Sequence, residues 1–270
     1  MLFESYWKNN VMKRLVFIFW GIMVMAGLMA QANPKKIINN AYIPGETLKY
    51  SLSYGWIEGG KCSLSVKEEL FENNKVYHAV ALGYTTGIAD KFFAVKDIFE
   101  SYFDPATGLP VKKIRNIKEN NYRFYNEARF DRTKNTVTSL KSGLKPSPEY
   151  ILDIVSVFYY LRCMDISKMK DGDIIKTVIF IDDRIFPFEI RYKGRETIET
   201  DLGYIDCYKF FPYTEPGKVF KEDDDMTIWF SADANMIPIR ISIEMWVASF
   251  DCDLVEYSNI VRPLKFREHK

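Results

Sequence analysis

The sequence offers few side chains for acid–base or nucleophilic catalysis. It contains two histidines, of which His269 lies in the polar C-terminal stretch and His78 alternates with Val76, Val80 and Leu82. A histidine on such an apolar strand face is usually a hydrogen-bonded core residue. The chain also lacks the G-x-S-x-G, H-E-x-x-H and glycine-rich phosphate-loop motifs. We therefore expect no catalytic site and no cofactor, and an enzyme of this sequence would have to rely on carboxylates alone.

The densest acidic cluster, Glu222 to Asp225, could supply oxygen ligands to a calcium ion. Its four acids are consecutive, however, and they lack the alternating spacing and the central glycine of a calcium-binding loop. A short run of like charges is typical of a solvated hairpin loop. We therefore predict no metal site.

Three polar side chains in one segment are candidates to hold the headgroup of a ligand. They are Asp153, Tyr160 and Arg162, and Asp153 and Tyr160 form a narrow polar strip with Ser156 if the segment is helical. The alternative is that these groups only satisfy neighbouring strand or loop groups, as buried polar groups generally do.

The chain is rich in aromatic residues, with 20 Phe, 17 Tyr and 5 Trp. Such side chains suit half-buried strand surfaces and also line apolar ligand pockets. Trp229 and Trp246 fall on strand faces opposite to the aliphatic residues, so they should point outward and meet a further element or a partner. Phe92 and Phe93 could form a lid. The aromatic ligand-binding candidates are Trp56, Phe92, Phe93, Trp229 and Trp246.

Alternation of apolar and polar residues with a period of two predicts antiparallel strands over most of the chain. The pattern begins with Leu48, Tyr50, Leu52 and Tyr54. Later segments with strand character are 62–66, 76–82, 97–103, 111–118, 122–131, 136–140, 173–181, 186–192, 195–200, 204–211, 226–230, 238–246 and 250–257. Turn residues such as Asp104-Pro105 separate them.

One segment breaks this alternation and predicts a helix from Ser147 to Asp165. Ser147 can cap the helix, Pro148 suits its first position, and apolar residues then recur at helical spacing. The segment is apolar nearly all round, which is typical of a buried helix. A sheet with one apolar face must also bury that face. The sequence therefore predicts a mainly β fold, in which a curved antiparallel sheet of about a dozen strands forms a half-barrel or open barrel around one central helix.

The N-terminal segment has the pattern of a secretory signal peptide. Lys13 and Arg14 precede an apolar run from Leu15 to Met29, and Ala30-Gln31-Ala32 fits a cleavage site, so Met12 is the expected start. An uncleaved anchor is the alternative, because the run is long for a signal. We expect a signal peptide at 1–32, a linker at 33–44, one β-rich domain at 45–262 and a polar tail at 263–270, in a periplasmic or otherwise exported bacterial protein.

Charge and cysteine content exclude several other classes. The chain has 37 basic and 36 acidic residues, and such near-neutrality argues against a nucleic-acid partner. No apolar run after the leader is long enough to span a membrane. The four cysteines, at 62, 163, 207 and 252, form no C-x-x-C pair. A Cys62–Cys252 disulfide and buried free thiols are both open.

Several short segments have a recognisable order and spacing. They are Pro44-Gly45-Glu46-Thr47-Leu48, the stretch from Asp153 to Arg162, Gly194-Arg195-Glu196, and Ile228 to Asp233 followed by Pro238-Ile239-Arg240. In this arrangement the chain resembles the exported bacterial family labelled domain of unknown function 3108. The resemblance implies an exported, β-rich protein of unestablished activity. By architecture alone the chain is also similar to half-barrel lipoprotein carriers, in which a sheet and a helix enclose an acyl-chain cavity.

Together these patterns favour a soluble binding protein of the cell envelope with a hydrophobic or amphipathic, lipid-like ligand. The alternative is a non-catalytic envelope module whose aromatic face contacts another protein. A carboxylate-dependent hydrolase ranks third.

Overall fold

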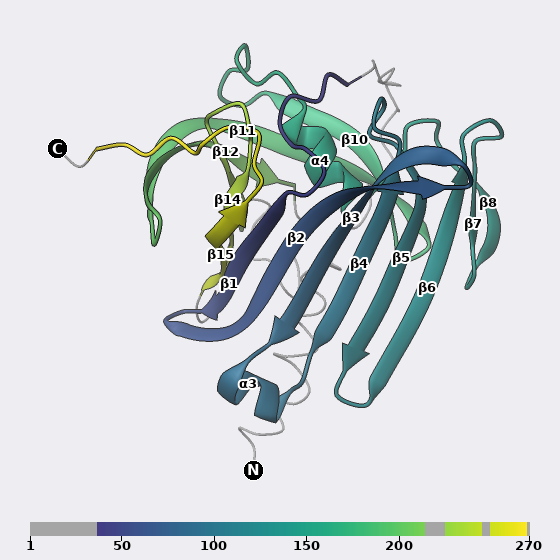
Figure 1. Cartoon of the computed structure of the whole chain (residues 1–270), viewed down its shortest axis with the longest axis horizontal. Coiled ribbons are helices and arrows are strands. Elements are labelled where there is room, and N and C mark those ends of the chain that lie inside the picture. Colours follow the sequence, from purple (N-terminus) through teal and green to yellow (C-terminus); the bar gives the residue numbers. More distant parts are fainter. Residues whose placement is uncertain (1–36, 214–224, 245–248, 269–270) are drawn as a thin grey trace.

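The computed structural model describes residues 37–213, 225–244 and 249–268, most of which form one β-sheet (Figure 1). The strands are β1 (Thr47–Tyr54), β2 (Ile57–Phe71), β3 (Asn74–Thr85), β4 (Lys96–Phe103), β5 (Pro110–Glu119), β6 (Tyr122–Asp131), β7 (Thr136–Ser139), β8 (Gly143–Pro146), β9 (Leu152–Asp153), β10 (Ile174–Ile181), β11 (Arg184–Thr200), β12 (Gly203–Pro212), β13 (Met226–Ser231), β14 (Pro238–Glu244) and β15 (Ser249–Ser258). The helices α3 (Gly87–Phe92) and α4 (Ser156–Arg162) are short. The predicted β class is confirmed, with 15 strands instead of about a dozen.

The order of the strands in the sheet follows the order of the chain almost throughout, as short turns between antiparallel strands require. The spatial order is β8-β7-β6-β5-β4-β3-β2-β1-β15-β14-β13-β12-β11-β10-β9. The two runs meet where β1 pairs with β15, so segments about 200 positions apart, such as Thr47 and Ser258, are neighbours. The two outermost strands, β8 and β9, are not paired with each other, and the sheet is open.

The period-two pattern sorts side chains onto an inner and an outer face. In β1, Leu48 and Tyr50 are buried and Lys49 between them is exposed. The inner face packs on α4, whose Tyr159 lies in one apolar cluster with Leu48 and Tyr50. The alternation therefore predicts the core face of β1 correctly. In β3 the expectation is wrong, because Ala79 enters the core cluster, whereas His78 and the apolar residues that alternate with it lie on the outer face.

The open sheet curls until its two ends overlap. The last three residues of strand β10 are buried, because Ile179 packs toward α4 and Phe180 packs against β6, with 5.8 Å between the ring centroids of Phe180 and Phe130. Polar side chains cross the same seam. Nζ of Lys113 on β5 donates to the carbonyl oxygen of Phe180 at 3.1 Å, and Arg115 forms an ion pair with Asp182. The two ends of the sheet are therefore held together by side-chain contacts between β5 or β6 and the end of β10, and not by backbone pairing of strands.

The predicted helix from Ser147 to Asp165 is wrong in its extent. Strand β8 ends at Pro146, β9 follows, and α4 has only seven residues. Leu152 pairs with Ile179 in a parallel bridge. An apolar pattern on all sides fits a strand buried on both faces as well as a buried helix, and here Ile151 and Leu152 enter different apolar clusters. The helix lies near one end of the roll, between the two halves of the sheet (Figure 1).

The segments flanking the sheet also pack. In the expected linker, Ala41 and Tyr42 are each 2% exposed, and Tyr42 contacts Tyr159 with 4.7 Å between ring centroids. In the expected tail, Leu264 is buried and Arg267 forms a bridge with Tyr204. The folded unit therefore extends at least from residue 41 to residue 267.

Several predicted features lie outside the described residues. They are the signal peptide at 1–32, Trp246, acidic residues 222–224 and His269. Within the described ranges, neither helix is long and apolar enough to cross a membrane. All four cysteines are free thiols. Burial raises the pKa of Cys163 to about 11 and that of Cys207 to about 12, so both are protonated at neutral pH.

Candidate functional site

The polar centre around α4 is a closed network of protein groups. The guanidinium of Arg162 donates to both carboxylate oxygens of Glu46, at 2.6 and 2.7 Å. It also donates to the carbonyl oxygens of Asn235 and Ala41, each at 3.0 Å. The side chains of Arg162 and Glu46 are 0% exposed. Protein groups thus accept four of the five N–H donors of the guanidinium, and the side chain has no exposure to solvent, so it is not presented to a ligand.

The carboxylate of Asp153 is also fully hydrogen-bonded to protein groups. One carboxylate oxygen accepts from the hydroxyl of Ser101 at 2.5 Å, and the other accepts from the backbone N–H groups of Val155 and Ser156, each at 2.8 Å. Burial raises the pKa of Asp153. The side chain holds the first turn of α4, because the first N–H groups of a helix have no partner within the helix.

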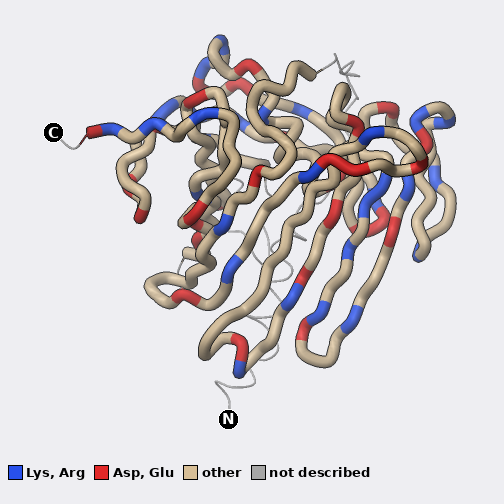
Figure 2. Tube along the Cα trace, in the orientation of Figure 1, with Lys and Arg blue, Asp and Glu red and all other residues tan. Residues whose placement is uncertain are grey.

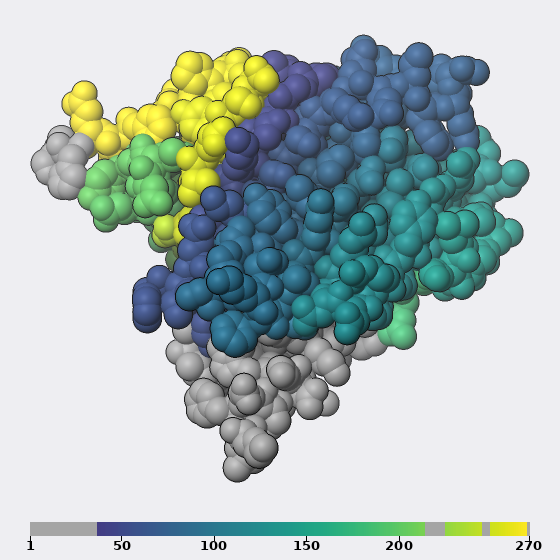
Figure 3. Space-filling view, turned by 60° about the horizontal axis from the view of Figure 1, so that its bottom comes forward, coloured from purple at the N-terminus to yellow at the C-terminus, as the bar shows by residue number. Residues whose placement is uncertain are grey.

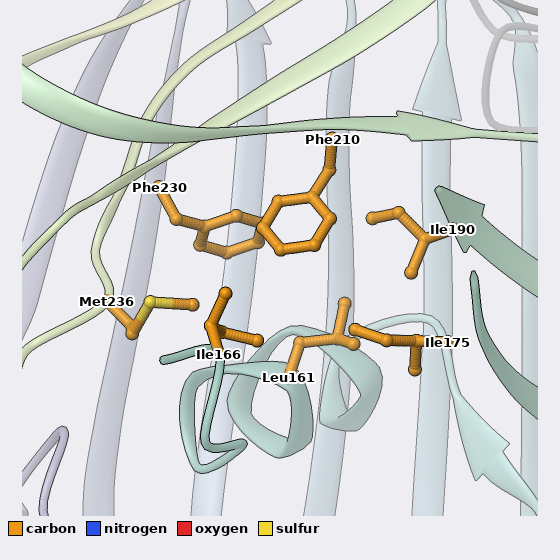
Figure 4. A pocket seen from close by; sticks show the side chains of 7 residues that line it. All are labelled: Leu161, Ile166, Ile175, Ile190, Phe210, Phe230 and Met236. Carbon is orange, nitrogen blue, oxygen red and sulfur yellow. The ribbon is translucent and has the colours of Figure 1, made fainter. Parts of the chain in front are cut away.

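The interior beside α4 is filled. Figure 4 shows aliphatic and aromatic side chains from the helix, the strands and the connecting loops pointing toward one another. They are Leu161, Ile166, Ile175, Ile190, Phe210, Phe230 and Met236, and the space among them has a free volume of about 0 Å³. Tyr160, the third predicted anchor, is half-buried against the same apolar cluster. No acyl-chain cavity is present among these described residues.

The aromatic candidates fall in different places. Trp229 lies on the face opposite to Ile228 and Phe230, and its indole N–H donates to Glu196. Trp56 is 92% exposed and Phe92 is 72% exposed, and both lie at the end of the roll that carries α3, whereas Phe93 is half-buried. The structure therefore groups Trp56, Phe92 and Phe93 but separates them from Trp229 and from the α4 network.

A groove of about 580 Å³ lies at the α3 end of strands β3 to β6, the end turned forward in Figure 3. The residues that line it are Leu82, Tyr84, Thr85, Asp90, Ala94, Val95, Lys96, Lys118, Asn120 and Arg123. The sheet register brings them together: Tyr84 is opposite Lys96, and Lys118 is opposite Arg123. This size falls in the range of about 300 to 1,000 Å³ that is typical of small-molecule sites.

The charge of the groove is mainly positive. Lys96, Lys118 and Arg123 are exposed, and Figure 2 shows basic residues along β4, β5 and β6. Asp90 is the acidic lining residue, and its carboxylate accepts from the hydroxyl of Thr85 at 3.0 Å. Three cations beside an apolar wall suit an anionic group that carries an apolar chain.

Two carboxyl groups near this end titrate at unusually high pH. Burial raises the pKa of Asp97 to about 6, although the backbone N–H of Lys118 donates to it at 3.1 Å. Burial, with the nearby charge of Asp97, raises the pKa of Glu119 to about 7. The net charge of this end therefore becomes more positive as pH falls toward 6.

Exposed apolar side chains surround the same end. Among them, Ile57 is 52% exposed, Ile88 is 72% exposed and Tyr122 is 55% exposed, in addition to Trp56 and Phe92. We call this set, Trp56, Ile57, Ile88, Phe92 and Tyr122, the apolar rim. It comes from the β1–β2 hairpin, α3 and the β5–β6 hairpin.

Backbone hydrogen bonds tie these three connections together. The N–H of Thr86 donates to the carbonyl oxygen of Gly59 at 3.0 Å, and the N–H of Asn120 donates to that of Ala94 at 2.7 Å. The amide oxygen of Asn120 accepts from the N–H of Ala94 at 2.9 Å. The rim is therefore carried by connected turns.

His78 lies on the outer face in a cluster with acids from neighbouring strands. Its Nδ1 is 2.8 Å from Glu69 and its Nε2 is 2.7 Å from Glu100, while its ring stacks on Tyr102 at 3.9 Å between centroids. Both ring nitrogens face carboxylates, which leaves neither directed at a serine or a cysteine. The hydrogen-bonded interpretation of His78 is confirmed, although the side chain is on the face opposite to α4.

Sequence reasoning missed the three basic residues of the groove. Each lies on a different strand, and only the register places them side by side. The one signal in the sequence is the hairpin around Asn120-Asn121, which predicts that Lys118 and Arg123 face each other.

The fold and the comparisons with known proteins together show which structural class and which family this chain belongs to. The chain is a rolled, open antiparallel β-sheet of the β-barrel-like kind. It belongs to the family described as "Protein of unknown function (DUF3108)", whose model matches residues 49–255. No curated protein matches it.

Two solved structures are among those similar to this chain, both at low sequence identity. A β-barrel-like protein of domain of unknown function DUF1849 from Brucella abortus has a TM-score of 0.54 and 11% identity, covering 82% of this chain and 99% of that one. A DUF1089 family protein from Pseudomonas aeruginosa has a TM-score of 0.35 and 7% identity, covering 79% and 95%. At such identity the first similarity supports the fold alone.

Proposed function

We propose that the protein is an exported binding protein for an anionic amphiphile, and that the ligand occupies the groove between β3 and β6. The observation that carries the proposal is the combination of a 580 Å³ groove with three basic side chains on its wall. Export rests on the leader pattern at 1–32, and periplasmic placement belongs to the same proposal.

The two parts of the ligand would meet different parts of the groove. Leu82, Tyr84 and Val95 supply apolar surface, and Lys96 and Lys118 supply charge. A carboxylate or phosphate ester gains charge-assisted hydrogen bonds from such groups, while its chain gains by leaving water. Phe93 is half-buried beside the groove, where its carbonyl oxygen accepts from the hydroxyl of the lining residue Thr85 at 3.2 Å, and its ring would cover a bound chain.

The α4 network has no part in this proposal. The polar side-chain atoms of Asp153 and Arg162 are already hydrogen-bonded to protein groups. A ligand that displaced one partner of a buried ion pair would leave the other charge unpaired, which is costly in free energy. An amphiphile at the groove leaves that network intact.

The test is binding of cis-parinaric acid, a fluorescent fatty acid, to the full chain and to variants. Lys118→Ala and Arg123→Ala should each weaken binding by about tenfold, because each removes a charge-assisted contact. Lys176→Ala is the matched control, since this exposed lysine pairs with Glu189 away from the groove. The methyl ester of the probe should bind more weakly than the acid.

Equal binding by the groove variants and the control would show that the ligand lies elsewhere. No binding by any of them, with the fold retained, would remove the carrier function. The aromatic envelope module would then be the better account.

A further inference from the structure

The apolar rim is an unusual surface for a protein in water. Trp56 exposes 92% of its surface, and Ile88 and Phe92 each expose 72%. Scattered apolar side chains are ordinary, but here large ones gather at the tips of three connections tied by hydrogen bonds. Such a surface is normally covered by a partner.

The charges beside the rim indicate which partner. Exposed Lys61 and Lys91 flank it, and the basic groove residues continue the same end. The acidic residues near this end include Glu58 and Asp90, which are exposed. Two others, Asp97 and Glu119, have raised pKa values of about 6 and about 7, so they carry less negative charge than ordinary carboxylates near these pH values. Apolar tips surrounded by basic side chains complement an anionic lipid surface, where the tips enter the interface and the cations meet the headgroups.

We propose that the α3 end of the roll docks on the surface of an anionic lipid bilayer. Trp56, Ile88 and Phe92 enter the headgroup region, and Lys61 and Lys91 lie against the phosphates. This interaction surface goes beyond the ligand groove and uses different side chains. It would place the groove beside the membrane.

The test is flotation of the full chain with vesicles of phosphatidylcholine alone and with vesicles that also contain phosphatidylglycerol. The double variant Trp56→Ser/Phe92→Ser should partition onto the anionic vesicles about tenfold less, because binding scales with the apolar area that enters the interface. The matched control is Leu70→Ser/Leu144→Ser, since these side chains are 74% and 69% exposed on other parts of the sheet. The control should bind as the parent does.

A second measurement, fluorescence quenching by brominated lipids, tests whether the rim itself enters the bilayer, even if another part of the chain also binds vesicles. Brominated lipids should quench a fluorescence component that Trp56→Phe removes and that Trp229→Phe leaves. Absence of quenching at Trp56 in vesicle-bound protein, or equal flotation of the rim and control variants, would overturn the proposal. Equal binding to neutral and anionic vesicles would overturn the part assigned to the lysines.

The two proposals fail separately. Rim variants should retain binding of cis-parinaric acid in solution, and Lys118→Ala should retain the quenching of Trp56. Loss of fatty-acid binding together with intact vesicle docking would remove only the groove function.

Discussion

At the scale of residues, the buried charges beside α4 are held by protein partners. Arg162 and Glu46 are separated by 116 positions, yet their side chains form a bidentate pair with no exposure to solvent. Such a pair adds little net stability over apolar packing, but loss of one partner costs about 3 to 5 kcal/mol. Its position joins the N-terminal segment, the first strand and α4, which fixes how these parts meet.

The His78 cluster should make stability depend on pH. Hydrogen bonding from His78 lowers the pKa of Glu100 below its ordinary value of 4.5, although burial opposes the shift. Its carboxylate therefore contributes stability above about pH 4.5, which is lost as pH falls through the lower, folded pKa. Glu69 and Lys112 are further charged groups that face the same cluster, and the neutral hydroxyl of Tyr102 donates to Glu100.

The measurement is urea unfolding of the parent chain and of Glu100→Gln from about pH 3 to about pH 7, a range that includes the ordinary carboxyl pKa values near 4. The advantage of the parent over the variant should shrink as pH falls below 4.5. Exposed Glu256→Gln is the control, and its difference from the parent should change less. A constant advantage of the parent over Glu100→Gln would contradict the assignment.

At the scale of elements, the segment around α4 shows how one apolar pattern serves two structures. Asp153 ends β9 and, through its carboxylate, holds the first N–H groups of α4. Both residues of the strand are buried. In the helix, Tyr159 packs in the apolar cluster that contains Leu48, and Leu161 packs in the apolar cluster that contains Ile179. A short helix can thus join the two halves of the sheet.

Tyr159 is the most informative position in this helix. Its ring is 0% exposed, and its hydroxyl has no hydrogen-bond partner among the described residues. Tyr159→Phe should leave stability unchanged or raise it by up to about 1 kcal/mol, because an unsatisfied buried hydroxyl is costly. Tyr159→Ala should cost about 3 to 5 kcal/mol through the cavity that it leaves.

Thermal and urea unfolding measure both changes. Half-buried Phe158→Ala serves as the comparison and should cost less than Tyr159→Ala. If Phe158→Ala proved the more damaging, the burial order within α4 would be wrong.

At the scale of the whole molecule, the fold depends on contacts between its sequence ends and its centre. The carbonyl oxygen of Ala41 accepts from Arg162, and Tyr42 packs on Tyr159, so residues before the first strand belong to the core. The overlap of β10 with β5 and β6 closes the roll in the same manner, through side chains.

Cleavage after Ala32 should therefore be compatible with folding. N-terminal sequencing of the protein isolated from its native cells should begin at Asn33, and a chain starting there should fold. A chain starting at Gly45 should lose at least about 3 kcal/mol, because it lacks the buried Tyr42 ring and an acceptor for Arg162. A mature product that begins at Met12 would support an anchor, and equal stability of the two shortened chains would contradict the role of Tyr42.

The sequence by itself determined the β class, most strand positions and the inner face of β1, because alternation with a period of two depends only on local geometry. It also determined the hydrogen-bonded character of His78. The tertiary structure alone decided the length of α4, the packing of residues 41 and 42, the occupied state of Asp153 and Arg162, and the grouping of Lys96, Lys118 and Arg123. Each of these depends on strand register and on the overlap of distant segments, which local spacing does not specify. The segment at 147–165 is an example. Its apolar spacing fits a helix, but residues 152 and 153 pair with β10, so only Ser156–Arg162 is helical.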